Sequence, residues 1–305
     1  MKIGGQAVIE GVMMRGPSSY AVAVRKEDNS IVTKKEKIKK RPKWTQLFFI
    51  RGITNLIDML VLGIKTLVWS SNQFVEEEDE KETFGWKETL FLIATSFGFA
   101  IIFFVALPYF LTNLAGFQEE TRPILFNLID GVIRIIVFVL YILIISLMKD
   151  IRRIFQYHGA EHKTVYCYED KKPLTYKNIK PYSTLHSRCG TSFIIIVLLI
   201  SIVVFSIFPS LVQAIYPDFL DLNFWIQKAI LFPLRILFIP VIAGISYEIL
   251  KFSDKYRKNL FLGLISKPGL WLQKLTTKQP DKRQVEVAVA ALKEVLSIEK
   301  KTKNI

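Results

Sequence analysis

Residues 193–215 read FIIIVLLISIVVFSIFPSLVQAI, a run with no charged side chain. About 20 helical residues cross the roughly 30 Å hydrocarbon core of a bilayer, so this run predicts a transmembrane helix. Residues 90–114, 124–148 and 224–250 are also apolar and long enough to cross. A hydrophobic content of 51% and a mean hydropathy of +0.31 agree with such a chain. The sequence therefore predicts an α-helical integral membrane protein with about four transmembrane helices.

The basic residues cluster outside these apolar segments and predict the orientation of the chain. The loops at 115–123 and 216–223 hold one basic residue, Arg122, between them, whereas residues 1–46, 149–192 and 251–305 are rich in lysine and arginine. The positive-inside rule places these three basic regions, and both termini, in the cytoplasm. The net charge of +14 is also typical of nucleic-acid binding, but its position beside apolar segments favours membrane lipids as partners and no nucleic acid. Two cysteines do not make a disulfide framework and are expected to be reduced there.

The chain divides into six regions. We expect a cytosolic β-rich segment at 1–46, and transmembrane helices at 90–148 and 193–250. Residues 47–89 hold an amphipathic helix, with Arg51, Asp58 and Lys65 at seven-residue spacing, and then an acidic linker at 76–82. The polar stripe favours a helix in the membrane interface over a spanning one, and the second possibility stays open. A cytosolic loop at 149–192 and a helical segment at 251–305 complete the chain.

The cytosolic regions are expected to form one small α+β domain from the N-terminal, central-loop and C-terminal segments. Alternation of Tyr20, Val22 and Val24 predicts a strand, and residues 31–38 could return as a second one. Residues 266–275 predict an interfacial turn or short helix anchored by Trp271. A helix after Pro280 carries one apolar face, predicted to pack on the β segment. That face consists of Val285, Val289, Leu292 and Leu296.

All three histidines lie in two short strings of the central cytosolic loop. His158-Gly159-Ala160-Glu161-His162 has the H-x-x-E-H pattern of an inverted zincin, in which both histidines reach one ion from the same helix face. Glu161 could then accept a proton from a water molecule at the ion. His186 and Cys189 could supply a further ligand, and so could Glu248 at the inner end of the fourth apolar segment. These residues predict a divalent metal site, with zinc as one candidate. The alternative is a small polar core in which the histidines bind backbone or carboxylate groups.

Cys167 lies in residues 164–169, an alternating pattern that predicts a strand and a place in the core.

Charged residues also lie well inside the predicted spans. Asp130 and Arg134 are four residues apart on one helix and can pair, and Arg235 lies between Pro233 and Pro240. A charge at mid-membrane costs at least about 2.5 kcal/mol and therefore faces a partner or a wet cavity. Salt bridges that fix the packing of the helices are favoured over a transport pathway.

Five ordered strings together resemble the YqhQ family, and they cover nearly the whole chain. They are residues 4–16, 158–162, 186–193, 243–248 and 268–280. Members of this family are bacterial membrane proteins described as predicted metal-dependent enzymes. The resemblance thus implies a location in the bacterial cytoplasmic membrane and dependence on a metal.

Two functions fit these observations. In the first, a metal-dependent hydrolase acts on a membrane-associated substrate, Glu161 is the base, and the glycine-rich segment with Glu10 and Arg15 closes over the site or binds substrate. In the second, a non-catalytic membrane factor binds another membrane protein, for example of the translocation or insertion machinery, through its basic cytosolic face. A transporter is a third possibility, and four spans would then require a homo-oligomer.

Overall fold

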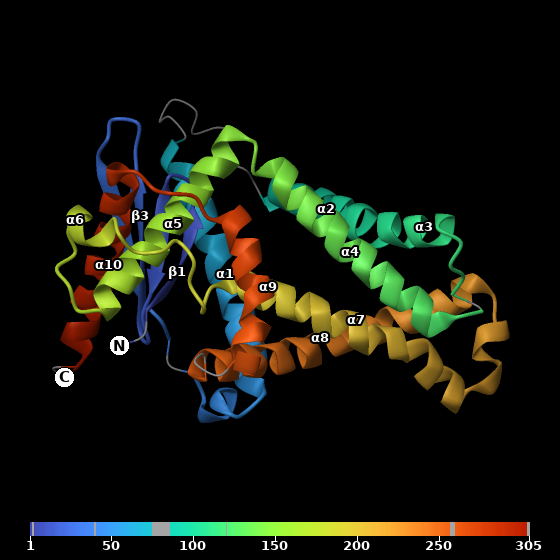
Figure 1. Ribbon diagram of the computed structural model, residues 1–305. Helices are drawn as coiled ribbons and strands as arrows, with labels where there is room; N and C mark the ends of the chain where they lie inside the picture. The colour runs from blue at the N-terminus through green and yellow to red at the C-terminus, as the bar shows by residue number, and fades with distance from the viewer. Residues whose placement is uncertain (2, 40, 75–85, 120, 257–259, 304–305) are drawn as a thin grey trace.

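The computed structural model describes residues 1, 3–39, 41–74, 86–119, 121–256 and 260–303. The predicted acidic linker at 76–82 lies outside the described residues. A small sheet with its covering helices occupies one end of the molecule, and long apolar helices project from it (Figure 1). The chain contributes to the sheet end from its beginning, its middle and its end, as predicted.

The sheet is an antiparallel meander of β1 (Gly4–Val8), β2 (Gly11–Arg15), β3 (Ser19–Arg25) and β4 (Ile31–Lys37). The predicted strand through Tyr20 and Val24 and its return at 31–38 are therefore confirmed. Side chains alternate between the two faces of the sheet, so each face has its own hydrophobic core. One face carries Val8, Met13, Tyr20, Val22 and Val24; the other carries Val12, Met14, Ala21 and Ala23.

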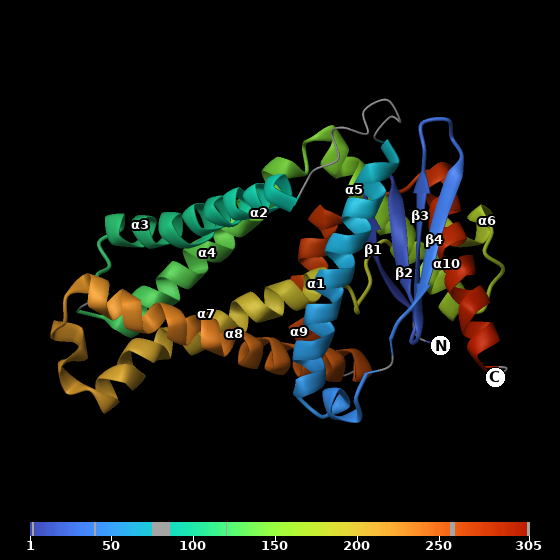
Figure 2. The same cartoon turned by 180° about the vertical axis from the view of Figure 1, so that it is seen from behind.

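Helices cover both faces of the sheet (Figure 2). α5 (Lys149–Glu169), the short α6 (Tyr176–Ile179) and α10 (Lys282–Lys303) form the core of one face. α1 (Ile50–Ser71) covers the other face with Met59 and Leu62, between the short helices η1 (Lys43–Gln46) and η2 (Asn72–Phe74). The predicted packing of the C-terminal helix on the β segment is confirmed, with Val285 and Leu292 fully buried.

One local prediction is wrong. Residues 164–169 form the last turns of α5 rather than a strand. Cys167 is buried in the core, as expected. The alternation is misleading because this part of α5 is buried nearly all round, so that polar and apolar positions no longer follow one helical stripe.

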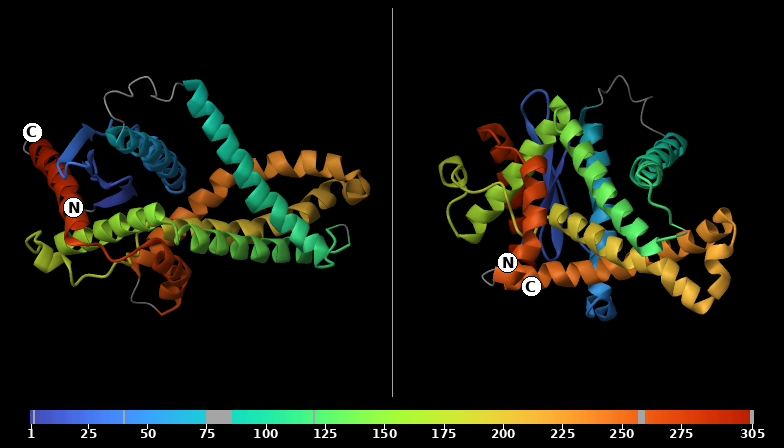
Figure 3. Two further views of the ribbon diagram at one scale, coloured as in Figure 1. Left: turned by 90° about the horizontal axis from the view of Figure 1, so that it is seen from above. Right: turned by 45° about the vertical axis from the view of Figure 1, so that its right-hand side comes forward.

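The apolar helices are α2 (Trp86–Ile101), η4 (a π-helical turn, Ile102–Ala106), α3 (Leu107–Leu114), α4 (Pro123–Ile145), α7 (Gly190–Ile215) and α8 (Phe224–Lys255). α7 packs against α4, α8 and α9 (Leu260–Thr276), and η5 (Pro217–Asp221) links α7 to α8. The helix 86–114 meets α4 at the end remote from the sheet and diverges from it toward α2 (Figure 3).

Five helices among the described residues are long and apolar enough to cross a membrane, whereas the sequence predicts about four. The additional one is Ile50–Phe74, which contains α1. α1 runs across α8 rather than along it (Figures 1 and 2). It meets α8 near the sheet, where Gly52 lies against Gly244 and Arg51 pairs with Glu248.

Candidate metal centre

Three potential metal ligands come together where α5 meets the start of α7. His158 and His162 lie one turn apart on α5, and Cys189 is the residue that precedes α7. One ligand atom from each lies within 4.8 Å of the other two. His162 and Cys189 are buried, with 2% and 8% of their surface exposed, and His158 is half-buried. The H-x-x-E-H string does fold as a helix, as its spacing requires.

The hydrogen bonds of both imidazoles favour the tautomer that binds a metal. His158 Nδ1 lies 2.8 Å from the Thr276 carbonyl oxygen, and His162 Nδ1 lies 2.5 Å from that of Thr184. A carbonyl only accepts, so each Nδ1 carries the proton and each Nε2 keeps its lone pair. His158 Nε2 lies 3.1 Å from Cys189 Sγ. This backbone support of the ligand ring is usual in metal sites, and a His₂Cys donor set suits zinc and leaves a fourth position for another ligand. The residues present thus fit a divalent metal ion.

Gly159 makes this arrangement possible. A Cβ atom at this position would overlap the Lys278 carbonyl oxygen. The Lys278 N–H group donates to the Phe155 carbonyl at 2.8 Å, which holds residues 276–278 against α5. Glycine therefore lets this segment approach α5 closely enough for Thr276 to support His158.

Glu161 faces the sheet from the same turn of α5. Its carboxylate accepts a hydrogen bond from the Gly5 N–H group, and Oε2 lies 3.9 Å from His162 Nε2. Burial raises the pKa of Glu161 to about 7, and the electrostatic influence of the nearby His158 and the hydrogen bond from Gly5 oppose this rise. A Cβ atom on Gly5 would lie only 2.9 Å from Glu161 Cγ, so this glycine makes room for the carboxylate. A carboxyl group with such a pKa can take up a proton near neutral pH.

His186 lies beside the cluster but has a different environment. Its ring centroid is 5.5 Å from that of His162 and 4.5 Å from that of Tyr166. The Arg188 N–H group donates to His186 Nδ1 at 3.3 Å, which puts the ring proton on Nε2, 4.0 Å from Glu169 Oε2. His186 therefore has the opposite tautomer, and of the two predicted third ligands the geometry favours Cys189.

Glu248 has a different partner from the predicted one. Its two oxygens accept from Nε and a terminal nitrogen of Arg51, each at 2.6 Å. This bidentate pair links α1 to α8, so the geometry does not support Glu248 as a metal ligand. The sequence could not show this, because the two residues are far apart along the chain.

Glu10 and Arg15 lie at opposite ends of β2 and do not meet at the cluster. Glu10 pairs with Arg153 and accepts from the Tyr157 hydroxyl at 3.2 Å. Arg15 pairs with Asp58 on α1 at 3.1 Å, on the other face of the sheet. These contacts hold the sheet to its helices, and a role of either residue in substrate binding stays a prediction.

The charged residues of the apolar helices form pairs of their own. Asp130 and Arg134 are joined at 2.6 Å on α4, as their spacing predicts. Arg235 on α8 donates to Asn127 Oδ1 on α4 at 2.9 Å.

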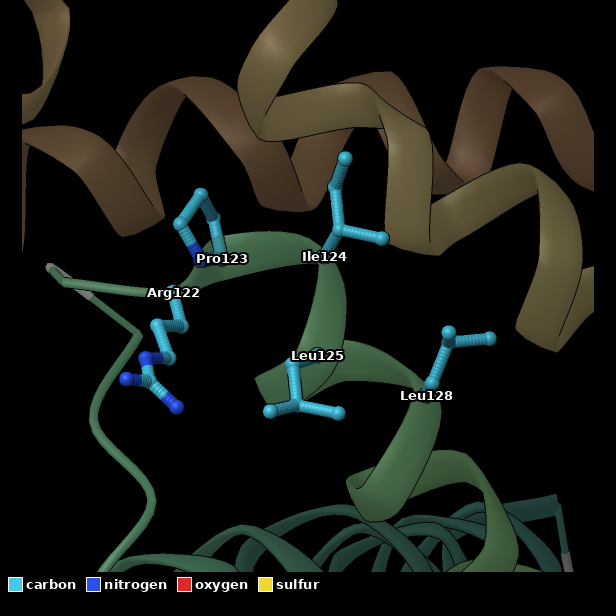
Figure 4. A pocket seen from close by; sticks show the side chains of 5 residues that line it. All are labelled: Arg122, Pro123, Ile124, Leu125 and Leu128. Atoms are coloured by element: carbon cyan, nitrogen blue, oxygen red, sulfur yellow. The ribbon is translucent and has the colours of Figure 1, made fainter.

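A shallow hollow lies at the start of α4, remote from the histidines (Figure 4). It is lined by Arg122, Pro123, Ile124, Leu125 and Leu128. Its lining is apolar apart from Arg122 and contains none of the groups that could perform the chemistry described above.

Sequence reasoning missed the groups that orient the cluster. Thr184 and Thr276 act through backbone carbonyls, which leave no trace in the side-chain pattern. Gln273 is completely buried, accepts from the His186 N–H group and donates to the His186 carbonyl and to Ser192 Oγ. A glutamine in an otherwise apolar stretch was the only available signal.

Comparison with known proteins identifies the family. The family model described as "Protein of unknown function (DUF1385)" matches residues 47–298. The chain belongs to the DUF1385 family. The chain is also similar to the "Uncharacterized protein YqhQ" of Bacillus subtilis (strain 168), with 37% identity over 316 residues that cover 97% of this chain and 92% of that protein. No solved structure matches the chain. The resemblance to YqhQ proteins is thus confirmed, and metal dependence of this DUF1385 member stays a prediction.

Proposed function

We propose that the protein is an integral membrane protein whose His158–His162–Cys189 cluster binds a divalent metal ion at the cytoplasmic face and hydrolyses a membrane-associated substrate. The observation that carries this proposal is the convergence of three donor atoms within 4.8 Å, with both imidazoles held in the metal-binding tautomer.

The packing of the sheet supports four crossings rather than five. β1 contacts α5 directly through Gly5 and Glu161, so the N-terminal strands and α5 must lie on the same side of a membrane. The chain must then cross an even number of times between them. Of the three candidate helices in that interval, the helix 86–114 and α4 account for two crossings. α1, which packs on the sheet, is the one that does not cross.

α1 suits the membrane interface instead. One face covers the sheet, while an apolar stripe on the rest of its surface is exposed. Residues 44–48 add further exposed apolar side chains before α1 begins. Burying this surface among lipid headgroups would remove it from water while the sheet stays in the cytoplasm. The exposed residues are Trp44, Leu47, Phe48, Ile57, Leu60, Val61, Ile64, Leu67 and Val68.

The position of the cluster favours a membrane-associated substrate. Cys189 immediately precedes the apolar helix α7, and α9, whose last residue is Thr276, packs along α7. The donor atoms thus lie at the level where α7 would leave the bilayer. A lipid-linked molecule or a membrane protein would reach this level without leaving the membrane.

The chain's own residues then have distinct roles. A divalent ion in the cluster would supply Lewis acidity at the bond to be cleaved. Glu161, near the cluster and with a pKa of about 7, would accept a proton from the attacking water. Thr184 and Thr276 would keep the imidazoles oriented through the reaction.

A second candidate is a non-catalytic membrane factor that binds another membrane protein. The burial of His162, Cys189 and Glu161 favours it, because a closed His/Cys site is typical of a structural metal. The exposed stripe of α1 and the basic cytosolic surface would then contact the partner.

The metal content of the purified full-length protein, measured by mass spectrometry, tests the proposal. We expect near-stoichiometric metal that is lost in a His158→Ala/His162→Ala double variant. His186→Ala is the matched control and should keep the metal, because its tautomer directs it away from the cluster. Wild-type protein that is folded and takes up no added zinc, manganese or iron would rule out the metal site.

Glu161→Gln distinguishes the two candidates. A hydrolase should keep its metal and lose its function in cells, whereas a structural site should tolerate the change.

A further inference from the structure

A seam of polar side chains runs between α4 and α8 in the half of the helices remote from the sheet. Asn127, Asp130 and Arg134 lie on one face of α4, and Lys228 and Arg235 lie seven residues apart on α8. Glu119, in the loop before α4, pairs with Lys228. Seven residues of helix correspond to about 10 Å, so the seam reaches from the loops to the middle of α4. Beyond Arg134, the rest of α4 (Ile135–Ile145) has no charged residue.

The seam contains more positive than negative charge. Its three cations are Arg134, Lys228 and Arg235, and its two anions are Glu119 and Asp130. Asp130 is joined to Arg134 and Glu119 to Lys228. Arg235 therefore has the neutral Asn127 amide as its hydrogen-bond partner and the Phe205 ring at 5.7 Å, while both carboxylates attract it from further away.

The hydrogen bonds of the seam are incomplete. Among the described residues, Nε of Arg134, Nε of Arg235 and Oδ1 of Asp130 are buried and make no hydrogen bond. A buried guanidinium is costly unless it is paired. Arg51 shows how the same chain completes a purely structural pair, because both its Nε and a terminal nitrogen donate to Glu248. Arg235 lacks such a partner.

We propose that Arg235 and Arg134 bind a phosphate-type oxyanion in this seam, and that the headgroup of an anionic phospholipid supplies it. The proposal rests on the proposed function only in that α4 and α8 cross the membrane. An anion between the two guanidinium groups would accept from both Nε–H groups and balance the additional positive charge. The loop end of the seam, where Glu119 pairs with Lys228, would lie at the level of the lipid phosphates.

Binding of phosphatidylglycerol and of phosphatidylcholine to full-length protein in detergent, measured by native mass spectrometry, tests this proposal. Hydrogen bonds to a charged group contribute about 1.5–3 kcal/mol, so Arg235→Gln should weaken phosphatidylglycerol binding about tenfold or more. Arg122→Gln is the matched control, because it removes one exposed positive charge at the start of α4 outside the seam. It should change binding less than about twofold, as expected for an exposed, screened charge.

Asn127→Asp separates binding from packing. A carboxylate beside Arg235 would neutralise it, so we expect an unchanged or higher melting temperature together with loss of phosphatidylglycerol binding. If the seam only fixes the helices, this variant will bind lipid as the wild type does, and the proposal fails.

Further arms identify the source of the anion. One arm asks whether millimolar inorganic phosphate displaces phosphatidylglycerol from the wild type and has no such effect on Arg235→Gln. This result would support the oxyanion site and show that a soluble anion, rather than a lipid, is its ligand. Wild-type protein without preference for phosphatidylglycerol and without affinity for phosphate would overturn the proposal. Metal content measured on the same samples shows independently whether the proposed metal site stands.

Discussion

Gly159 shows how one missing side chain can position a site. In an ordinary helix, alanine at this position would be more stable by about 1 kcal/mol. Here a Cβ atom would overlap the Lys278 carbonyl, so we expect Gly159→Ala to lower both the melting temperature and the metal content. Gly98→Ala on α2 is the control, because nothing lies within 4 Å of its Cβ position. Equal melting temperatures for the two variants would show that residues 276–278 do not depend on Gly159.

Glu299 holds the turn between β2 and β3 from α10. It accepts from the Ser18 N–H group and the Ser19 hydroxyl, both at 2.8 Å. Burial raises the pKa of Glu299, but these hydrogen bonds outweigh it and leave the pKa below its usual value near 4.5. Its stabilisation is therefore fully present above about pH 4.5 and is lost as the pH falls through the lower folded pKa.

Thermal unfolding of Glu299→Gln tests this role. The variant should be less stable than the wild type by about 1–3 kcal/mol at pH 7. The difference should shrink as the pH falls below about 4.5 and through the lowered pKa of Glu299, because the wild-type carboxylate then becomes protonated. A difference that does not change with pH would show that size and shape, rather than charge, are what matter at this position.

At the residue scale, the spacing of residues along the sequence predicts which side chains meet on one helix, and it does not predict contacts between different elements. His158, Glu161 and His162 could be identified because helix geometry alone places them within one turn. Cys189 and His186 could not be separated, since their difference depends on which backbone groups surround each ring. The pairing of Glu248 with Arg51 could not be predicted, because only the folded chain brings these two residues together.

At the scale of elements, α1 and α8 are joined by a compact set of contacts. Arg51 pairs with Glu248, the Asn55 amide donates to the Tyr247 hydroxyl at 3.1 Å, and Phe49 lies on Gly244. Loss of Glu248 leaves the half-buried Arg51 without its carboxylate. We expect Glu248→Ala to cost about 1–3 kcal/mol in unfolding free energy and to leave the metal content unchanged.

Glu294→Ala is the matched control for Glu248→Ala. It removes a carboxylate from an exposed pair with Lys35, which contributes about 0–1 kcal/mol. If Glu248→Ala loses its metal while the control keeps it, the result would support Glu248 as a metal ligand.

The helix α10 could be predicted because one of its faces is exposed, whereas the second half of α5 could not. α10 has a clear apolar period and starts with the reciprocal Asp281–Gln284 capping box. α5 is covered by the sheet on one side and by residues 184–189 and 276–278 on the other, so its second half has no polar stripe. Because this half of α5 is buried on nearly all sides, it holds the candidate site inside the protein, and for the same reason its sequence shows no clear helical period.

At the scale of the whole molecule, the packing of β1 on α5 fixes which segments share a compartment. We expect Glu27→Cys, in the turn between β3 and β4, to react with an impermeant thiol reagent only after cells are permeabilised. Asp218→Cys, in η5, should react in intact cells. The two native cysteines are buried and should contribute little labelling. Labelling of both variants in intact cells would contradict four crossings.

The charge distribution grouped the N-terminal, central and C-terminal segments, and the structure does bring these segments together at the sheet. Their orientation in a membrane, which rests on the positions of lysine and arginine, stays a prediction. The count of apolar helices could not be predicted as reliably. α1 is apolar toward both the sheet and its surroundings, and composition does not distinguish a protein neighbour from a lipid one.

The sheet is built from the first 37 residues, yet α10, which completes one of its cores, begins only at Lys282. At a synthesis rate of about 5–20 residues per second, the roughly 240 residues between them take about 12–50 s to make. During that time Val12, Ala21 and their neighbours lack the cover that α10 later provides. Each newly synthesised chain therefore exposes part of this apolar face of the sheet, and α10 covers it only at the end of translation.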